Sequence, residues 1–243
     1  MTFQFARPFQ FAMQDPAWLK KIAILALCFF IPFVGPFAAL GYYQAMMKNV
    51  ADGDESLPEW DRFGEYIGRG FKAFAVILLY MLPSVVVYVG SMVVSMAMIA
   101  LLTDKNGQGI GGTIGGLLMM AGGVLAFVLF LGGLLMVPAG IAKMVDEDSL
   151  AAALKPVNVF KFVFGNFVNV LMAIVVGMIG GMIAPLGMIA CFIGIYATIA
   201  FSMSIRAHAW GQVIALSRER EYRPIVTGKP RRPVPTDDGL VPA

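Results

Sequence analysis

The chain has 243 residues, of which 59% are hydrophobic and only 14% are charged, with a mean hydropathy of +0.79 and a net charge of +3. Residues 73–103, 106–142 and 162–205 carry no charged side chain. An apolar run of about 18 residues without charge is typical of a membrane-spanning helix, and these runs are longer. The composition therefore excludes a water-soluble globular protein and predicts one membrane domain over residues 1–222.

The N-terminal part of the chain has two apolar features. Residues 1–19 mix aromatic with polar side chains and lack the pattern of a cleaved signal peptide, which predicts a segment lying at the membrane surface. Residues 22–47 are apolar but are interrupted by Pro32 and Pro36, on either side of Gly35. Because each arm is too short for a comfortable crossing, we expect a helical hairpin that returns to its own side.

The remaining chain predicts four long spans, at residues 72–102, 112–144, 166–184 and 187–208. Pro185 and Gly187 separate the last two spans, and a short helix at 150–155 precedes the third. Residues 223–243 are rich in proline and arginine, which predicts a disordered cytoplasmic tail. The predicted fold class is an all-α polytopic membrane protein, with an N-terminal proline-broken hairpin and short interfacial helices.

The placement of lysine and arginine predicts the topology. If residues 22–47 return to their own side, 17 of the 18 cations share one face and only Lys105 lies opposite; a crossing would divide them 14 to 4. Cytoplasmic flanks carry the excess of these residues, so we expect both termini in the cytoplasm. Anionic lipid headgroups are the expected partner of the basic C-terminal residues, at about 1 kcal/mol per cation near the surface. These are Arg218, Arg220, Arg223, Lys229, Arg231 and Arg232.

Residues 51–63 form the sequence Ala-Asp-Gly-Asp-Glu-Ser-Leu-Pro-Glu-Trp-Asp-Arg-Phe, here called the signature segment. With Asp15-Pro16, Trp18 and Lys20, the Ile31-Pro32-x-x-Gly35 motif and Gly41-Tyr42, it resembles the prokaryotic integral-membrane family known as domain of unknown function 4013. The resemblance is best over residues 10–100. It implies a multi-span fold in a prokaryotic membrane, here the inner one, and implies no activity and no catalytic residue. Its signature residues are Gly53, Leu57, Pro58, Glu59, Trp60 and Phe63.

The signature segment has two interpretations. In the first, Trp60 anchors at the interface, Pro58 sets the first turn of a short helix and Glu59 stabilises its positive end. In the second, the segment is a docking surface for a cytoplasmic partner. A calcium loop is excluded, because Leu57 and Phe63 stand where such a loop needs glycine and glutamate.

Two sets of small residues on the apolar helices indicate sites of close contact. Glycines at helical spacing predict helix packing, within one chain or between copies in a homo-oligomer; they are Gly115, Gly122, Gly177, Gly181, Gly187 and Gly194. Ser84, Ser91 and Ser95 share one face of the 72–102 helix. That face could join two helices or line a path for a solute.

No set of residues suggests catalysis. The chain has one histidine and two separated cysteines, and the predicted spans carry no charge up to Arg206. A nucleophile with its base, a paired acid and base, or a metal cluster is therefore hard to assemble, and we expect no metal, cofactor or nucleic acid. The favoured hypothesis is a non-enzymatic membrane scaffold that binds a partner. The alternative is an uncoupled transporter or channel for a small solute or lipid, using the serine face.

Overall fold

The computed structural model describes residues 2–104 and 106–222, with the backbone alone at 190–193 and 221–222. The regular elements of this part are helices, in agreement with the predicted all-α class. The α-helices are α1 (Arg7–Gln14), α2 (Trp18–Cys28), α3 (Val34–Ala51), α4 (Phe63–Leu102), α5 (Gly111–Glu147), α6 (Leu150–Ala153), α7 (Pro156–Gly165), α8 (Phe167–Ile183) and α9 (Cys191–Tyr222). Two 3₁₀ helices, η1 (Trp60–Arg62) and η2 (Ala184–Ala190), precede α4 and α9. The predicted tail, 223–243, lies outside the described residues.

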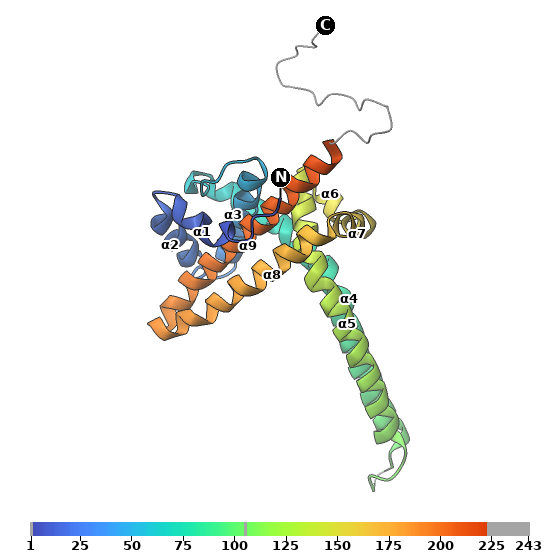
Figure 1. Ribbon diagram of the computed structural model, residues 1–243. Coiled ribbons are helices and arrows are strands. Elements are labelled where there is room, and N and C mark those ends of the chain that lie inside the picture. Colours follow the sequence, from blue (N-terminus) through green and yellow to red (C-terminus); the bar gives the residue numbers. More distant parts are fainter. Residues whose placement is uncertain (1, 105, 223–243) are drawn as a thin grey trace, which may run out of the picture.

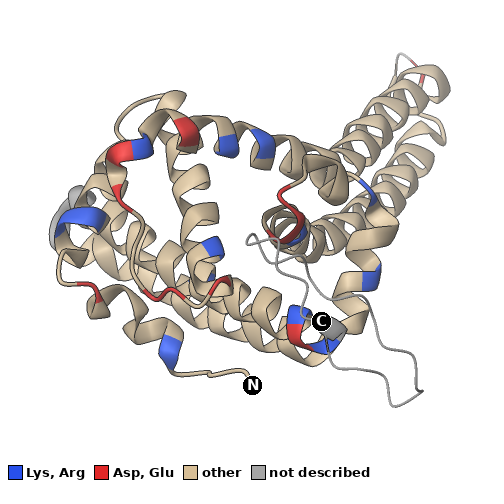
Figure 2. Cartoon of the chain, turned by 90° about the horizontal axis from the view of Figure 1, so that it is seen from above, with Lys and Arg blue, Asp and Glu red and all other residues tan. Residues whose placement is uncertain are grey.

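Helices α4 and α5 form a long two-helix arm that points away from the other helices (Figure 1). They have 40 and 37 residues, which at 1.5 Å per residue makes them about 60 and 55 Å long. Charged residues gather on the remaining helices, here called the body, while most of the arm carries none (Figure 2). Each helix is longer than the roughly 30 Å of bilayer hydrocarbon, and the apolar composition of the arm is suited to that environment.

Three helical segments of the described chain are long and apolar enough to cross a membrane: Trp60–Leu102, Gly111–Glu147 and Phe167–Ile189. They contain the predicted spans 72–102 and 112–144 and nearly all of 166–184. The predicted span 187–208 lies mostly in α9, and it stays a prediction. The helices extend past several predicted limits, since charge marks where a chain leaves hydrocarbon and does not end a helix.

Helix α9 is the centre of the body, with α1, α2, α3 and α8 packed around it (Figure 1). Its residues Ile205, Val213 and Ile214 are fully buried. Close approach to α3 depends on Gly211, where an added Cβ would lie 2.6 Å from the Val50 Cβ. The core therefore joins the N-terminal helices to the last helix of the chain.

The predicted proline break separates α2 from α3. Helix α2 ends at Cys28 and α3 begins at Val34, whose N–H donates to the Pro32 carbonyl at 2.8 Å. Phe33 at the centre of this turn has φ +63° and ψ −57° and is 84% exposed. Such a γ-turn is rare and strained for a residue with a side chain. The turn thus holds an aromatic ring away from the protein at the tip of the α2–α3 pair.

Candidate functional site

A buried ion pair fastens the signature segment to the start of α2. The Lys21 ammonium donates to Asp15 Oδ2 at 2.8 Å and to the Leu57 carbonyl at 2.8 Å, and it pairs with Glu59 Oε1 at 2.6 Å. The side chains of Lys21 and Asp15 are only 6% and 4% exposed. Each of the three ammonium protons therefore has an acceptor, which is the condition under which a buried lysine stays charged.

Asp15 completes this junction. Its Oδ1 accepts the Ala17 N–H at 2.7 Å, and its Oδ2 also accepts the Leu57 N–H at 3.0 Å. Burial opposes ionisation, but the hydrogen bonds from Lys21 and the two backbone N–H groups outweigh it, so the pKa of Asp15 is lowered. Burial likewise disfavours charge on Lys21, yet Asp15 and Glu59 leave its pKa raised. Both groups are charged at neutral pH and hold the segment in place.

An aromatic cluster covers the ion pair. Trp60 stacks on Tyr42 with ring centroids 4.1 Å apart and an interplanar angle of 5°, and its Nε1–H donates to the Lys21 carbonyl at 3.1 Å. The Tyr42 hydroxyl donates to the Pro58 carbonyl at 2.9 Å, and Tyr66 lies edge-on to both rings. Trp60 is therefore half-buried against α3 in this structure.

The other signature residues differ in exposure. Leu57 and Pro58 are buried, Phe63 begins α4 beside Trp60, and Gly53 has φ +86°, a conformation that favours glycine. The Glu59 side chain is 70% exposed although it reaches Lys21. Together with the exposed Asp61 and Arg62 it forms the outward face of the segment, here called the signature surface.

The serine face of α4 lies against the glycine face of α5. An added Cβ at Gly122 would collide with the Ser91 side chain, and one at Gly115 would lie 2.9 Å from the Ser95 carbonyl. Ser84 and Ser91 donate to carbonyls three residues earlier in their own helix. Ser84 and Ser95 are buried, and the Ser95 hydroxyl has no partner among the described residues. This contact is referred to below as the serine–glycine seam.

The predicted glycines of the last helical pair lie between α8 and α9. Added Cβ atoms at Gly177 and Gly181 would meet the Arg206 side chain, and one at Gly187 would collide with the Gly194 carbonyl and the Thr198 hydroxyl. The Gly194 carbonyl also accepts the Thr198 hydroxyl at 3.1 Å. These glycines are thus placed at contacts within one chain, while self-association through the same faces stays a prediction.

A second charged cluster joins α3, α5 and α9. The Arg218 guanidinium donates to Asp146 Oδ1 at 2.7 Å and to Asp52 Oδ1 at 2.8 Å, and Lys48 pairs with Asp52 at 2.8 Å. Burial opposes charge on Asp52, but Lys48 and Arg218 leave the pKa of this carboxyl lowered. Arg218 therefore connects α9 with the ends of α3 and α5, whereas the sequence predicted a headgroup contact for it.

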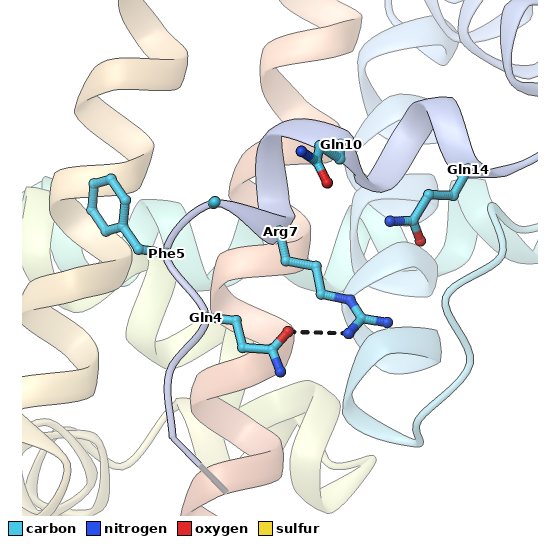
Figure 3. A pocket seen from close by; sticks show the side chains of 6 residues that line it. Gln4, Phe5, Arg7, Gln10 and Gln14 are labelled. Atoms are coloured by element: carbon cyan, nitrogen blue, oxygen red, sulfur yellow. Dashed lines mark hydrogen bonds between the residues drawn. The ribbon is translucent and has the colours of Figure 1, made fainter.

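A shallow polar pocket lies at the N-terminus, lined by glutamine amides and the Arg7 guanidinium (Figure 3). Arg7 donates to Gln4 Oε1 at 3.1 Å and to Glu55 Oε2 at 2.7 Å. The Gln4 backbone is bound by both ends of the Gln212 amide, at 2.7 and 3.1 Å. The pocket thus lies where the N-terminal segment, the signature segment and α9 meet.

Sequence reasoning missed the partners in all three polar clusters. Asp15 and Lys21 are six residues apart, yet both contact Leu57, whose position no local pattern predicts. Arg218 reaches Asp52 across 166 residues. The sequence held only a weak signal for these partners. Lys21 directly precedes the apolar residues 22–47, and a lysine in that position is equally typical of a simple membrane boundary.

One comparison with known proteins gave a match. A family described as "Protein of unknown function (DUF4013)" matches residues 24–193, which run from the second half of α2 to the start of α9 and include the signature segment. No curated protein and no solved structure matches the chain.

Proposed function

Since the chain belongs to the DUF4013 family of proteins of unknown function, we propose from its own residues that it is a non-enzymatic membrane scaffold. Its apolar helices anchor it in the bilayer, and its charged body presents the signature surface to a protein partner. The observation that carries the proposal is the serine–glycine seam. Contact between Gly122 and Ser91 leaves the serines between two helices, and a solute path would need them to face water.

The proposed placement in the membrane follows the charges. Helices α4 and α5 cross and return, α8 and α9 form the third and fourth spans, and the α2–α3 tip inserts without crossing. Both termini lie in the cytoplasm of a prokaryotic cell, on the face that carries α1, α7 and the signature surface. This arrangement exposes the signature surface to cytoplasmic partners and the basic C-terminal residues to anionic headgroups.

The signature surface supports partner binding through its rigidity. Lys21, Tyr42 and Trp60 fix the segment from behind, so Glu59, Asp61 and Arg62 are presented on an ordered backbone. Binding to a preorganised surface loses less conformational entropy. A photoreactive side chain at Asp61 should cross-link to a partner, and Glu59→Lys should abolish this cross-link. The same photoreactive group at Gln108, in the far loop of the arm, should not cross-link to the partner.

Flux measurements test the scaffold against the transporter. In liposomes containing the purified protein, glycerol efflux and the exchange of fluorescent phosphatidylglycerol between leaflets should equal those of protein-free liposomes. Flux that disappears in Ser91→Leu but persists in Met92→Leu would overturn the scaffold proposal. Met92 suits the control because it is adjacent and exposed on α4.

A further inference from the structure

Arg206 lies in the seam between α8 and α9. It is the first charged residue after Lys161, and its side chain is exposed. Its Cγ lies 3.6 Å from the position of an added Cβ at Gly177, and its Nη2 lies 2.7 Å from that position at Gly181. The two glycines therefore leave a notch along α8 that the arginine side chain occupies.

The Arg206 side chain leans towards the N-terminus of its own helix, as helical side chains do, and for α9 this end lies at the α8–α9 tip. Helix α8 runs from the body towards the α8–α9 tip, so Gly181 lies nearer the tip than Gly177 (Figure 1). The guanidinium lies beside Gly181 and therefore points towards the α8–α9 tip.

Ser202 supplies a second polar group in the same seam. It is 3% exposed, and its hydroxyl has no hydrogen-bond partner within the described residues. Thr198, one turn earlier, donates to the Ala184 carbonyl at 2.7 Å and fixes the antiparallel register of the two helices. Ser202 lies one helical turn before Arg206 and on the same side of α9.

The surroundings of the guanidinium favour an external anion. No ion pair joins Arg206 to a carboxylate in the described part of the chain, and Gly177 and Gly181 belong to a segment apolar enough to span a membrane. A charge in such a place is costly without a partner. Guanidinium groups bind phosphate through two parallel hydrogen bonds, and a serine hydroxyl can donate a third. Met178 and Met182, exposed on the adjoining face of α8, offer a surface for acyl chains.

We propose that the seam at Arg206, Ser202, Gly177 and Gly181 binds the phosphate of an anionic phospholipid. The proposal rests on the membrane placement of α8 and α9 given above. Both helices slant relative to the α4–α5 arm, and their tip ends closer to the body than the arm does (Figure 1). In that placement the guanidinium, which lies beside Gly181 near the tip, is closest to the headgroups of the leaflet that the tip reaches.

Lipid titrations of the purified full-length protein test this site. Native mass spectrometry should show that phosphatidylglycerol binds more tightly than phosphatidylcholine. Arg206→Gln should weaken phosphatidylglycerol binding about tenfold or more, and Arg206→Lys less, because lysine keeps the charge and loses the fork geometry. The matched control is Lys161→Gln, an exposed cation on α7, which should leave the affinity unchanged.

Three results would overturn the proposal. The first is equal binding of the two lipids by the unmodified protein, and this measurement does not depend on whether a variant folds. The second is an unchanged affinity in a folded Arg206→Gln protein. The third is displacement of phosphatidylglycerol by inorganic phosphate at the same concentration, which would assign the site to the free anion. None of these depends on the flux assay, so the scaffold proposal can fail or succeed separately.

Discussion

Lys21 and Lys20 are neighbours in sequence but differ completely in environment. Lys21 is buried against Asp15 and Leu57, while Lys20 is exposed. Lys21→Met should destabilise the protein by about 3 kcal/mol, because it leaves the buried Asp15 carboxylate without its cation. Lys20→Met should change stability by less than about 0.5 kcal/mol. Denaturant unfolding in detergent, followed by tryptophan fluorescence, measures both, and equal effects would contradict the role given to Lys21.

The same pair predicts how stability depends on pH. The pKa of Asp15 is lowered from 3.8 in the folded protein. Its contribution to the free energy of unfolding is therefore present above that value and is lost as pH falls through the folded-state pKa. The pKa of Lys21 is raised from 10.5 in the folded protein. Its contribution to the free energy of unfolding is therefore present below that value and is lost as pH rises through the folded-state pKa. Unfolding free energy measured against pH should fall at both extremes. In Asp15→Asn the acid decline should be smaller, and an identical decline would exclude Asp15 as its source.

Single residues also mark the limit of sequence reasoning. The signature segment could be located at residues 51–63, because its sequence resembles a family pattern. Its buried partners could not be found: Lys21 fitted a membrane flank equally well, and the resemblance that includes Tyr42 does not say what its ring contacts. Burial of a charge depends on which distant backbone folds over it, and no local periodicity carries that information.

At the scale of elements, the two faces of α5 provide a matched pair of substitutions. An alanine Cβ at Gly122 would collide with Ser91, whereas Gly123 has open space around it. Gly122→Ala should therefore destabilise the arm by about 1–3 kcal/mol, and Gly123→Ala should stabilise it by up to about 1 kcal/mol through helix propensity. Thermal unfolding distinguishes them. Ser91→Gly should restore stability to Gly122→Ala, and the absence of rescue would indicate a different contact.

The tip of the α2–α3 pair combines backbone strain with exposure. Replacing Phe33 by glycine should raise stability in detergent by about 1 kcal/mol, because glycine adopts positive φ without a steric cost. The same change should reduce contact with acyl chains if the tip inserts. A Phe33→Trp protein checks this, since brominated acyl chains should quench its extra fluorescence. A tip that lies in water would show no added quenching.

Breaks between elements were easier to predict than their ends. The prolines near Gly35 and at Pro185 lie where α2, α3 and α8 begin or end, because proline lacks the N–H that a helix needs. The ends were less accurate: α4 starts at Phe63 instead of residue 72, and α9 continues to Tyr222 instead of 208. Residues 63–72 and 209–222 carry charge, yet they continue the helices, since charge marks the edge of hydrocarbon and does not end a helix.

For the whole molecule, the decisive question is whether the α2–α3 pair returns to the side of the body. In a protein whose Cys28 and Cys191 are replaced by alanine, single cysteines at Lys20, Lys161 and Gln108 report three positions on the chain. A maleimide that cannot cross membranes should label Lys20→Cys and Lys161→Cys from one side and Gln108→Cys from the other. Labelling of Lys20→Cys from the Gln108 side would mean that residues 22–47 cross. Such a crossing would place α1 and the start of α2 on the opposite side of the membrane from α7. Two observations argue against it: α1 and α2 pack against α9, and Arg7 pairs with Glu55 of the signature segment.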